Sequence, residues 1–370
     1  MASALLIDLE SILAPISDEA PSGSDCRESP SPNSNYQIIK SARNSARSIE
    51  RTNIFGDADS ESEEHWRKVL DLSPKIIREE SKDLEVASWY AEALVRKHGF
   101  RGLSIAFKLI HGLIEQYWDV LYPMPDEDGI ETRVSPLSGL NGEGAEGVLI
   151  APIRNNIVTE GSSVGPFTYW EYQQAVEVHR ISDQENQEER EKKLGFKLAD
   201  IEKAIDESSV EFVTELRDDI ADCISVYKAI SEILDERCGA YDAPPTSNIL
   251  NILEECHGAI MHLGQSKFPA EELPEDLTGD TTDDSGTPTS ATAAKQAAAG
   301  PIATREQAFK QLEEIAKFFR KTEPHSPVSY ILEKSVKWGN MPLNELVREL
   351  IPDSSALNHY SMLTGVKTED

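Results

Sequence analysis

The sequence predicts an all-α protein. Along most of the 370 residues, apolar side chains recur every three or four positions, as in amphipathic helices, and no convincing pair of segments alternates apolar and polar residues as half-buried strands do. Segments rich in proline, glycine and serine separate these runs. We therefore expect a helical N-terminal domain at 1–180, a helical-hairpin middle region at 181–266, a flexible acidic linker at 267–302 and a small helical C-terminal oligomerisation module at 303–370.

The N-terminal domain is expected to consist of successive helices. A short opening helix is predicted over 5–13, and a second helix ends near Arg51. The segment EEHWRKVLDLSPKIIREE reads as two helices bent at Ser73-Pro74, because proline disfavours helical geometry in the residue before it. Two apolar runs then follow, over 83–100 and 100–123, and Gly99 between them can end the first as a C-cap. The stretch GVLIAPIRNNIV is compatible with a strand or a short helix.

A seven-membered apolar stripe dominates the middle region. Its members follow one another at alternating spacings of three and four, which is a heptad seam three repeats long. A turn signal, GAYDAPPTSN, separates this helix from a second one over 246–263, and the two are expected to form an antiparallel αα-hairpin. The stripe fits an intramolecular core and a dimer seam equally well at this stage. Its residues are Val213, Leu216, Ile220, Cys223, Tyr227, Ile230 and Leu234.

The last hundred residues divide into a tether and a self-associating module. Residues 267–302 have scarcely any bulky apolar side chain, so they cannot offset the entropy of ordering and are predicted to be disordered. From Ala303 onward the spacing indicates three short amphipathic helices with prolyl breaks between them. Helices this short cannot bury all their apolar surface among themselves. The interface candidates are Phe318, Phe319, Val328, Tyr330, Trp338, Leu343 and Leu346.

Composition excludes several classes of partner. The formal charge of -30 argues against nucleic acid and anionic membrane surfaces, because phosphates require a concentrated basic face. No run of about 18 apolar residues could span a bilayer, and the N-terminus lacks the basic region of a signal peptide. The four cysteines are too scattered for a disulfide framework. We expect a cytoplasmic protein that binds other proteins and holds no cofactor.

Several short motifs imitate ligand sites. Residues 142–147 have the GxGxxG spacing of a dinucleotide turn, but their two glutamates would repel phosphate. The DEDG turn at 126–129 lacks the ligand order of an EF-hand, and Cys256, His257 and His262 do not share a helix face as zinc requires. Glu323, His325 and Ser326 are too close in sequence to form a hydrolase triad. The loop APSGSD reads as a turn, although a partner-docking loop has the same composition.

Longer motifs carry a family resemblance. The segments PISDEAPSGSDCR, SKDLEVASWYAEALVRKHGFRGL, YWDVLYPMPDEDG and TEPHSPVSYILEKSVKWGNMPLNEL together resemble the TssA proteins of the bacterial type VI secretion system, also called the ImpA family. The resemblance covers essentially the whole chain except 267–302, and its terminal motif is similar to the short, baseplate-like branch. It implies an ImpA-type N-terminal domain, a middle region associated with pairing and a ring-forming C-terminal module.

Function follows mainly from that resemblance. We expect a structural assembly component, not an enzyme, that oligomerises through 303–370 and helps to build or hold the baseplate and the contractile sheath and tube. Its expected partners are itself, the sheath, tube and baseplate proteins and, as a further candidate, the membrane complex. One alternative is a metal- or carboxylate-dependent enzyme that uses the DEDG turn with His98 or His111. Another is a monomeric acidic adaptor.

Overall fold

The all-α fold is confirmed. The computed structural model describes residues 7–29, 31–52, 58–127, 129–239, 242–268, 305–322 and 328–339, together with Met341 and Leu346. Throughout these residues the regular elements are helices, and the only β contacts are isolated bridges. The chain forms two compact units, 1–277 and 278–370.

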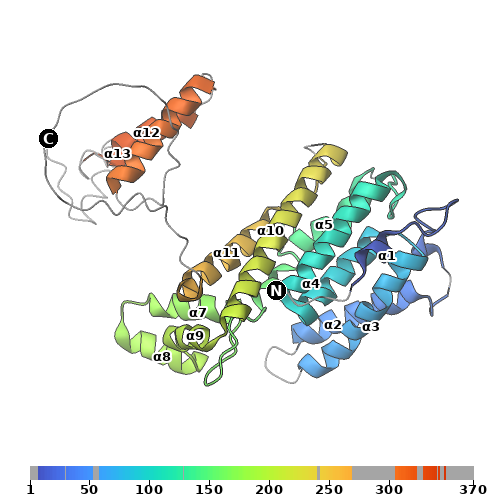
Figure 1. The fold of residues 1–370 in the computed structure, drawn as a ribbon, viewed down its shortest axis with the longest axis horizontal. Helices are drawn as coiled ribbons and strands as arrows, with labels where there is room; N and C mark the ends of the chain where they lie inside the picture. Colours follow the sequence, from blue (N-terminus) through green and yellow to red (C-terminus); the bar gives the residue numbers. More distant parts are fainter. Residues whose placement is uncertain are drawn as a thin grey trace, which may run out of the picture. The chain divides into compact units, whose positions relative to one another are not determined.

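The first half of unit one is built around one long, buried helix. Helix α4 lies between α2 and α3 on one side and α10 on the other (Figure 1). It is buried on most of its circumference, which explains why its sequence is apolar with little periodicity. The elements of this half are α1 (Leu9–Leu13), η1 (Cys26–Glu28), α2 (Asn35–Thr52), α3 (Ala58–Glu79), α4 (Leu84–Tyr117), η2 (Trp118–Val120), α5 (Glu131–Asn141) and α6 (Ile150–Arg154).

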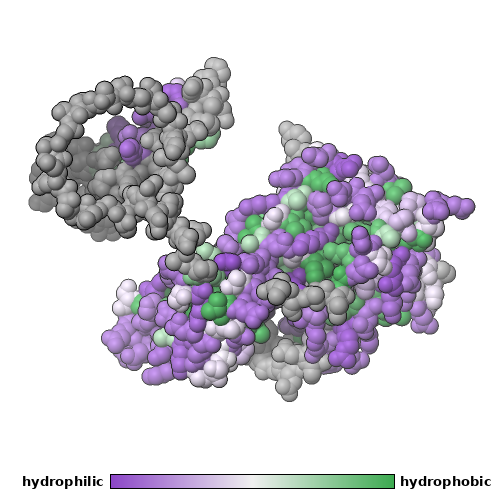
Figure 2. Space-filling view, in the orientation of Figure 1, coloured by the Kyte–Doolittle hydropathy of each residue, from purple (hydrophilic) through white to green (hydrophobic). Residues whose placement is uncertain are grey.

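The second half of unit one adds a small helical group and the hairpin. Helices α7 to α9 surround a satellite core of Phe167, Ala175, Ile201 and Ala204, while α10 and α11 pack against each other and against the first half. On the face shown in Figure 2, hydrophilic residues cover most of the unit and apolar residues show only in narrow patches. The elements are α7 (Tyr169–His179), α8 (Gln184–Leu194), α9 (Leu198–Glu207), α10 (Val210–Cys238), α11 (Ser247–Leu263) and η3 (Gln265–Lys267).

Two helix breaks were predicted within the N-terminal domain, and the structure has one of them. Gly99 has φ 61° and ψ −148°, so α4 is kinked where the sequence placed a C-cap. The predicted bend at Ser73-Pro74 is wrong, because α3 continues through Pro74 as a single helix. Val69 before the proline and Ile76 after it are both fully buried. Packing on both sides of Pro74 therefore outweighs the one backbone hydrogen bond that proline removes.

The core does not divide at residue 180. One continuous cluster of buried side chains runs from Ile12 on α1 to Ile260 on α11, and it includes the middle hairpin that the sequence assigned to a separate domain. The ordered unit also extends past 266, because Phe268 packs against this core and Arg217 lies over its ring at 4.8 Å. The rest of the predicted linker, 269–302, lies outside the described residues. The stretch 147–158 contains the short helix α6, at Ile150–Arg154, and no strand.

The second unit contains two described helices, α12 (Arg305–Thr322) and α13 (Val328–Gly339), which pack against each other. Ala316 and Val336 are buried in this unit, and an ion pair of 2.8 Å joins Arg320 to Glu333. The third predicted helix falls outside the described residues except for Leu346, which is helical.

Candidate functional site

Three of the family-like segments meet at the start of α4. The backbone amide of Lys82 donates to the carbonyl of Ser22 at 2.8 Å, and the amide of Tyr122 donates to the carbonyl of Lys82 at 3.0 Å. The amide of Leu84 returns a bond of 2.8 Å to the carbonyl of Tyr122. Backbone hydrogen bonds therefore connect the segments around Ser22, Lys82 and Tyr122. We name this region the motif junction.

Lys82 is the fully buried cation of the motif junction. Its Nζ donates to the carbonyl oxygens of Ile12 at 2.6 Å and Ile77 at 2.8 Å, and lies 5.6 Å from the ring centroid of Tyr117. Both carbonyls belong to the last turns of helices, α1 and α3, where carbonyl groups lack a helical partner. Burial lowers the pKa of Lys82 to about 8. Lys82 therefore joins two helix ends, a role that sequence analysis missed because it depends on where those ends lie.

Asp83 and Arg27 form the charged part of the motif junction. Asp83 caps α4 by accepting from the amides of Glu85 at 2.8 Å and Val86 at 3.1 Å. Arg27 donates to Asp83 at 2.6 Å and to Glu85 at 2.7 Å, and Tyr36 donates its hydroxyl to Glu85 at 2.8 Å. Burial lowers the pKa of Arg27, but the carboxylates of Asp83 and Glu85 outweigh it and raise the pKa. The loop APSGSD thus ends in a structural ion-pair network.

This network also contains the one metal-like grouping in the described part of the chain. Ligand atoms of Asp25, Cys26 and Asp83 lie within 4.8 Å of one another. Arg27 binds Asp25 at 3.0 Å and Asp83 at 2.6 Å, so a guanidinium already supplies the positive charge between these carboxylates. Burial and the charge of Asp83 raise the pKa of the Cys26 thiol, which disfavours the thiolate that a metal needs. Asp25 and Asp83 are therefore better suited to pair with Arg27 than to bind a metal ion.

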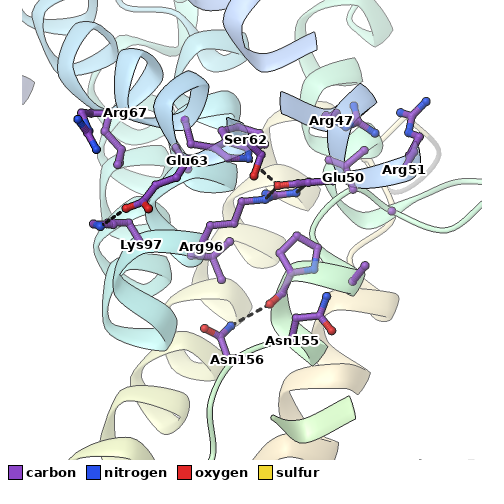
Figure 3. A pocket seen from close by; sticks show the side chains of 18 of the residues that line it. Arg47, Glu50, Arg51, Ser62, Glu63, Arg67, Arg96, Lys97, Asn155 and Asn156 are labelled. Carbon is purple, nitrogen blue, oxygen red and sulfur yellow. Dashed lines mark hydrogen bonds and ion pairs between the residues drawn. The ribbon is translucent and has the colours of Figure 1, made fainter. Parts of the chain in front are cut away.

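A pocket of about 830 Å³ opens between α2, α3, α4 and the segment that leads into α6 (Figure 3). It stands out in an acidic chain because most of its charged side chains are basic. Trp66 and Leu70 supply apolar surface, and Asn155 and Asn156 supply amides. We name this feature the basic pocket. Its cationic residues are Arg47, Arg51, Arg67, Arg96 and Lys97.

Two of these cations have dedicated carboxylates. Arg96 donates to both oxygens of Glu50, at 2.9 and 3.0 Å, and its guanidinium lies 4.2 Å from the ring centroid of Trp66. The indole of Trp66 donates to the same Glu50 at 2.6 Å. Lys97 pairs with Glu63 at 2.5 Å, and Figure 3 shows the two pairs side by side.

The remaining cations are less well compensated. Arg47 lies 3.8 Å from a carboxylate oxygen of Glu92, whose other oxygen accepts from Arg43 at 2.6 Å. Burial lowers the pKa of Arg47; Glu92 opposes this shift, while the neighbouring arginines reinforce it. Arg51 and Arg67 are exposed, and neither forms an ion pair with any residue that the structure describes.

The residues of the middle stripe are the buried residues of α10: Val213, Leu216, Ile220, Cys223, Tyr227, Ile230 and Leu234. They face α4 and α11 of the same chain. The rings of Tyr227 and Phe107 lie 4.6 Å apart, and the thiol of Cys223 donates to the carbonyl of Phe100 at 3.1 Å. The structure thus covers this stripe within one chain, which is the core alternative rather than the dimer seam.

The C-terminal candidates are only partly described. Tyr330 is 58% exposed, and Phe319, Trp338 and Leu346 are half-buried. Two cations lie on this aromatic surface, Arg320 at 4.9 Å from the ring centroid of Tyr330 and Lys334 at 4.7 Å from that of Trp338. The side chains of Phe318 and Val328, and the whole of Leu343, lie outside the described residues.

The short ligand-like motifs have structural explanations where they are described. A Cβ on Gly142 or Gly147 would lie 2.2 Å from a backbone oxygen, so the GxGxxG glycines serve a tight turn between α5 and α6. No strand precedes this turn in the described chain, as a dinucleotide site requires. In the DEDG turn, Asp126 accepts from Thr132 near the start of α5, while Asp128 lies outside the described residues. The hydrolase-like trio at 323–326 also lies outside them.

Comparisons with known proteins agree with the resemblance. Residues 13–142 match the family model described as ImpA, N-terminal, type VI secretion system. The chain is 24% identical over 372 residues to the type VI secretion system component TssA1 of Pseudomonas aeruginosa, covering 98% of this chain and 100% of that protein. The structure resembles the N-terminal domain, including the conserved ImpA_N region, of the TssA component from Burkholderia cenocepacia, with a TM-score of 0.58 and 25% identity over 71% of this chain and 96% of that one.

The predicted resemblance to the TssA/ImpA family is therefore confirmed, and the ImpA N-terminal match includes the motif junction. The matched descriptions all name a type VI secretion system component or its N-terminal region. Among the described helices, none is both long and apolar enough to cross a membrane.

Proposed function

We propose that this chain is a structural component of a bacterial type VI secretion system and assembles into a homo-oligomeric ring through its C-terminal unit. In this role it works in the cytoplasm and helps to build or hold the baseplate and the contractile sheath and tube, as the short TssA branch does. Its partners are further copies of itself, the sheath, tube and baseplate proteins and, as a further candidate, the membrane complex.

The observation that carries this proposal is the match to a type VI secretion component along nearly the whole of both chains. A shared domain alone would leave the rest of the protein free to do something else. Here the similarity extends through the middle hairpin to the C-terminal unit, so the same arrangement of parts is expected to serve the same kind of assembly.

Exposed apolar residues on the second unit support self-association. Ile315 is 44% exposed, Tyr330 58% and Ile331 59%, on helices whose own contact buries smaller residues such as Ala316. Apolar side chains left in water at this density are typical of protein interfaces. Repetition of one such contact closes into a ring when its rotation permits. When several copies are joined in a ring, their individually weak contacts with a partner act together and give a higher overall affinity.

The test is the mass of the full chain by light scattering. We expect the unmodified protein to form a defined oligomer, and the double variant Tyr330→Ser/Ile331→Ser to shift toward the monomer mass of 41.0 kDa. The matched control is Val210→Ser/Met261→Ser, which removes two residues of the first unit that are 55% and 42% exposed. Circular dichroism should remain unchanged in both, because exposed substitutions cost little stability.

Two outcomes would contradict the proposal. A single copy per particle for the unmodified chain at micromolar concentration would favour the monomeric acidic adaptor. Metal retained through dialysis, with a changed melting temperature on its removal, would favour the enzyme that uses the DEDG turn. Co-purification of the full chain with sheath or baseplate proteins, lost in Tyr330→Ser/Ile331→Ser and kept in the control, would link assembly to the secretion system.

A further inference from the structure

We propose that the basic pocket of the first unit binds an acidic peptide segment of a partner protein. The pocket lies in a different unit from the surface proposed for self-association, so this inference does not depend on ring formation. The partner is defined by its chemistry, an extended segment with carboxylate side chains at alternate positions.

The first step is the charge of the pocket in a chain of net charge -30. Five cationic side chains line it, against three carboxylates, Glu50, Glu63 and Glu146. All three carboxylates are engaged: Glu50 by Arg96, Glu63 by Lys97, and Glu146 by Arg154 at 2.8 Å. The positive charge that remains comes from Arg51 and Arg67, while Arg47 shares Glu92 with Arg43, so the pocket presents an excess of cations to whatever enters it.

The second step is the electrostatic repulsion among the arginines of the pocket when no ligand is bound. Arg47 is largely buried and shares the single carboxylate of Glu92 with Arg43. Neighbouring arginines lower its pKa further, which means that they repel its charge. Within the part of the chain that the structure describes, no ion pair neutralises Arg51 or Arg67. An incoming anion would relieve the repulsion, and guanidinium groups pair with carboxylates through two parallel hydrogen bonds.

The third step is the spacing of the cations, which favours a peptide over a compact phosphate. Arg47 and Arg51 are separated by four residues of α2, which is about 6 Å along a helix axis. Alternate side chains of an extended peptide are about 6.6 Å apart, so two carboxylates at positions i and i+2 can meet the two arginines. Arg67 belongs to α3, and Figure 3 shows it across the pocket from Arg51, which suits a ligand that spans the opening.

The rest of the lining also suits a peptide. A pocket of about 830 Å³ can hold several side chains. Asn155 and Asn156 line the same pocket as the apolar side chains of Trp66 and Leu70, and the Nδ2 of Asn156 also donates to the carbonyls of Pro152 and Ile153. Amides of this kind can bond the backbone of an extended segment, while the apolar surface accepts a side chain between the acids.

The test measures binding of a fluorescein-labelled octaglutamate peptide to the full chain by fluorescence anisotropy at low ionic strength. We expect saturable binding that added salt weakens. The variant Arg51→Glu/Arg67→Glu should weaken it by at least about tenfold, because two attractive pairs become repulsive. The charge-preserving variant Arg51→Lys/Arg67→Lys should retain much of the affinity. The matched control is Arg180→Glu/Arg190→Glu, which makes the same charge change at exposed positions outside the pocket.

Three results would overturn the inference. Equal loss of affinity in Arg180→Glu/Arg190→Glu would show that the peptide responds only to net charge. Unchanged affinity in Arg51→Glu/Arg67→Glu would place binding elsewhere. Displacement of the peptide by equimolar inorganic phosphate or ATP would assign the pocket to phosphate groups. The mass of Arg51→Glu/Arg67→Glu by light scattering should equal that of the unmodified chain, so a failure here is distinguishable from a failure of ring assembly.

Discussion

Two helical regions of this protein carry apolar stripes of similar spacing, α10 in the first unit and the pair α12 and α13 in the second. On α10 the stripe from Val213 to Leu234 is covered by α4 and α11 of the same chain. On the second unit, Tyr330 and Ile331 are each more than half exposed. By spacing alone, both stripes are candidate association surfaces.

The difference shows that spacing identifies a face to be covered but not what covers it. Helix α10 has a long neighbour: α4 continues past the kink at Gly99 and brings Phe107 against Tyr227. The two described helices of the second unit have each other and cover only part of their apolar surface. In the second region, the large apolar side chains of Tyr330 and Ile331 therefore remain exposed.

The largest loss of stability is expected when the packing against the buried stripe of α10 is disturbed. Phe107→Ala should lower the free energy of unfolding of the first unit by about 3 to 5 kcal/mol, because it leaves a cavity against Tyr227. Urea denaturation followed by far-ultraviolet circular dichroism measures it. The matched variant Ile331→Ala should cost less than about 1 kcal/mol, since its side chain is exposed in the single chain. Equal costs at the two positions would remove the contrast between the regions.

A smaller loss of stability is expected when a buried helix-capping carboxylate is compared with an exposed one. Asp83→Asn keeps an oxygen to cap α4 but removes the buried negative charge that faces Arg27. We expect a loss of about 2 kcal/mol, because Arg27 loses a charged hydrogen-bond partner that is fully buried, while Asp25 and Glu85 still pair with it. Asp183→Asn makes the same change at the exposed cap of α8, whose carboxylate accepts from the amide of Glu185 at 3.0 Å, and should cost less than about 1 kcal/mol. Thermal melts of both variants would contradict this explanation if the two shifts were equal.

The smallest predicted effect is a loss of stability at alkaline pH in the first unit. Burial raises the pKa of Cys223 and Cys256, and raises those of Cys238 to about 11 and Tyr90 to about 12. Above pH 9 the unfolded chain therefore releases thiol protons that the native chain retains, and stability falls as pH rises. Lys82, with a pKa lowered to about 8, acts in the opposite direction between about pH 8 and 10.5.

The acidic groups outnumber Lys82, so a net loss of about 1 to 2 kcal/mol per pH unit is expected above pH 9. Urea titrations at a series of pH values, with a reductant present, measure this slope. The variant Cys223→Ala/Cys256→Ala should flatten it, because two of the buried thiols are then absent. A slope that stays unchanged in this variant would show that other groups carry the alkaline response.

Local pattern was sufficient for the middle hairpin of α10 and α11 and for the side of α10 that is buried. Alternating spacings of three and four selected the seven residues that α10 buries, because a helix repeats every 3.6 residues wherever it packs. Gly99 was identifiable because its conformation is one that glycine adopts readily. Pro74 was misread because its cost is local and small, whereas burial of Val69 and Ile76 on either side of it is contributed by distant helices.

The candidate sites depended more strongly on tertiary structure. The motif junction joins residues about 60 and 100 positions apart, so neither the role of Lys82 nor the pairing of Arg27 with Asp83 follows from spacing. Its one signal in sequence was that the three segments carry the family resemblance. The basic pocket gave no signal, because its cations come from three helices and are diluted among 66 acidic residues.

By itself, the sequence determined the helical class, the apolar faces and the family resemblance, since each depends on residues close together in the chain or on motifs read directly. Only the tertiary structure decided that α10 is covered by α4, that the middle hairpin shares its main core with the N-terminal helices, and that cations outnumber carboxylates in the lining of the basic pocket. The reason is physical: burial and electrostatic energy depend on distances between groups in space, and those distances are set by how the helices pack.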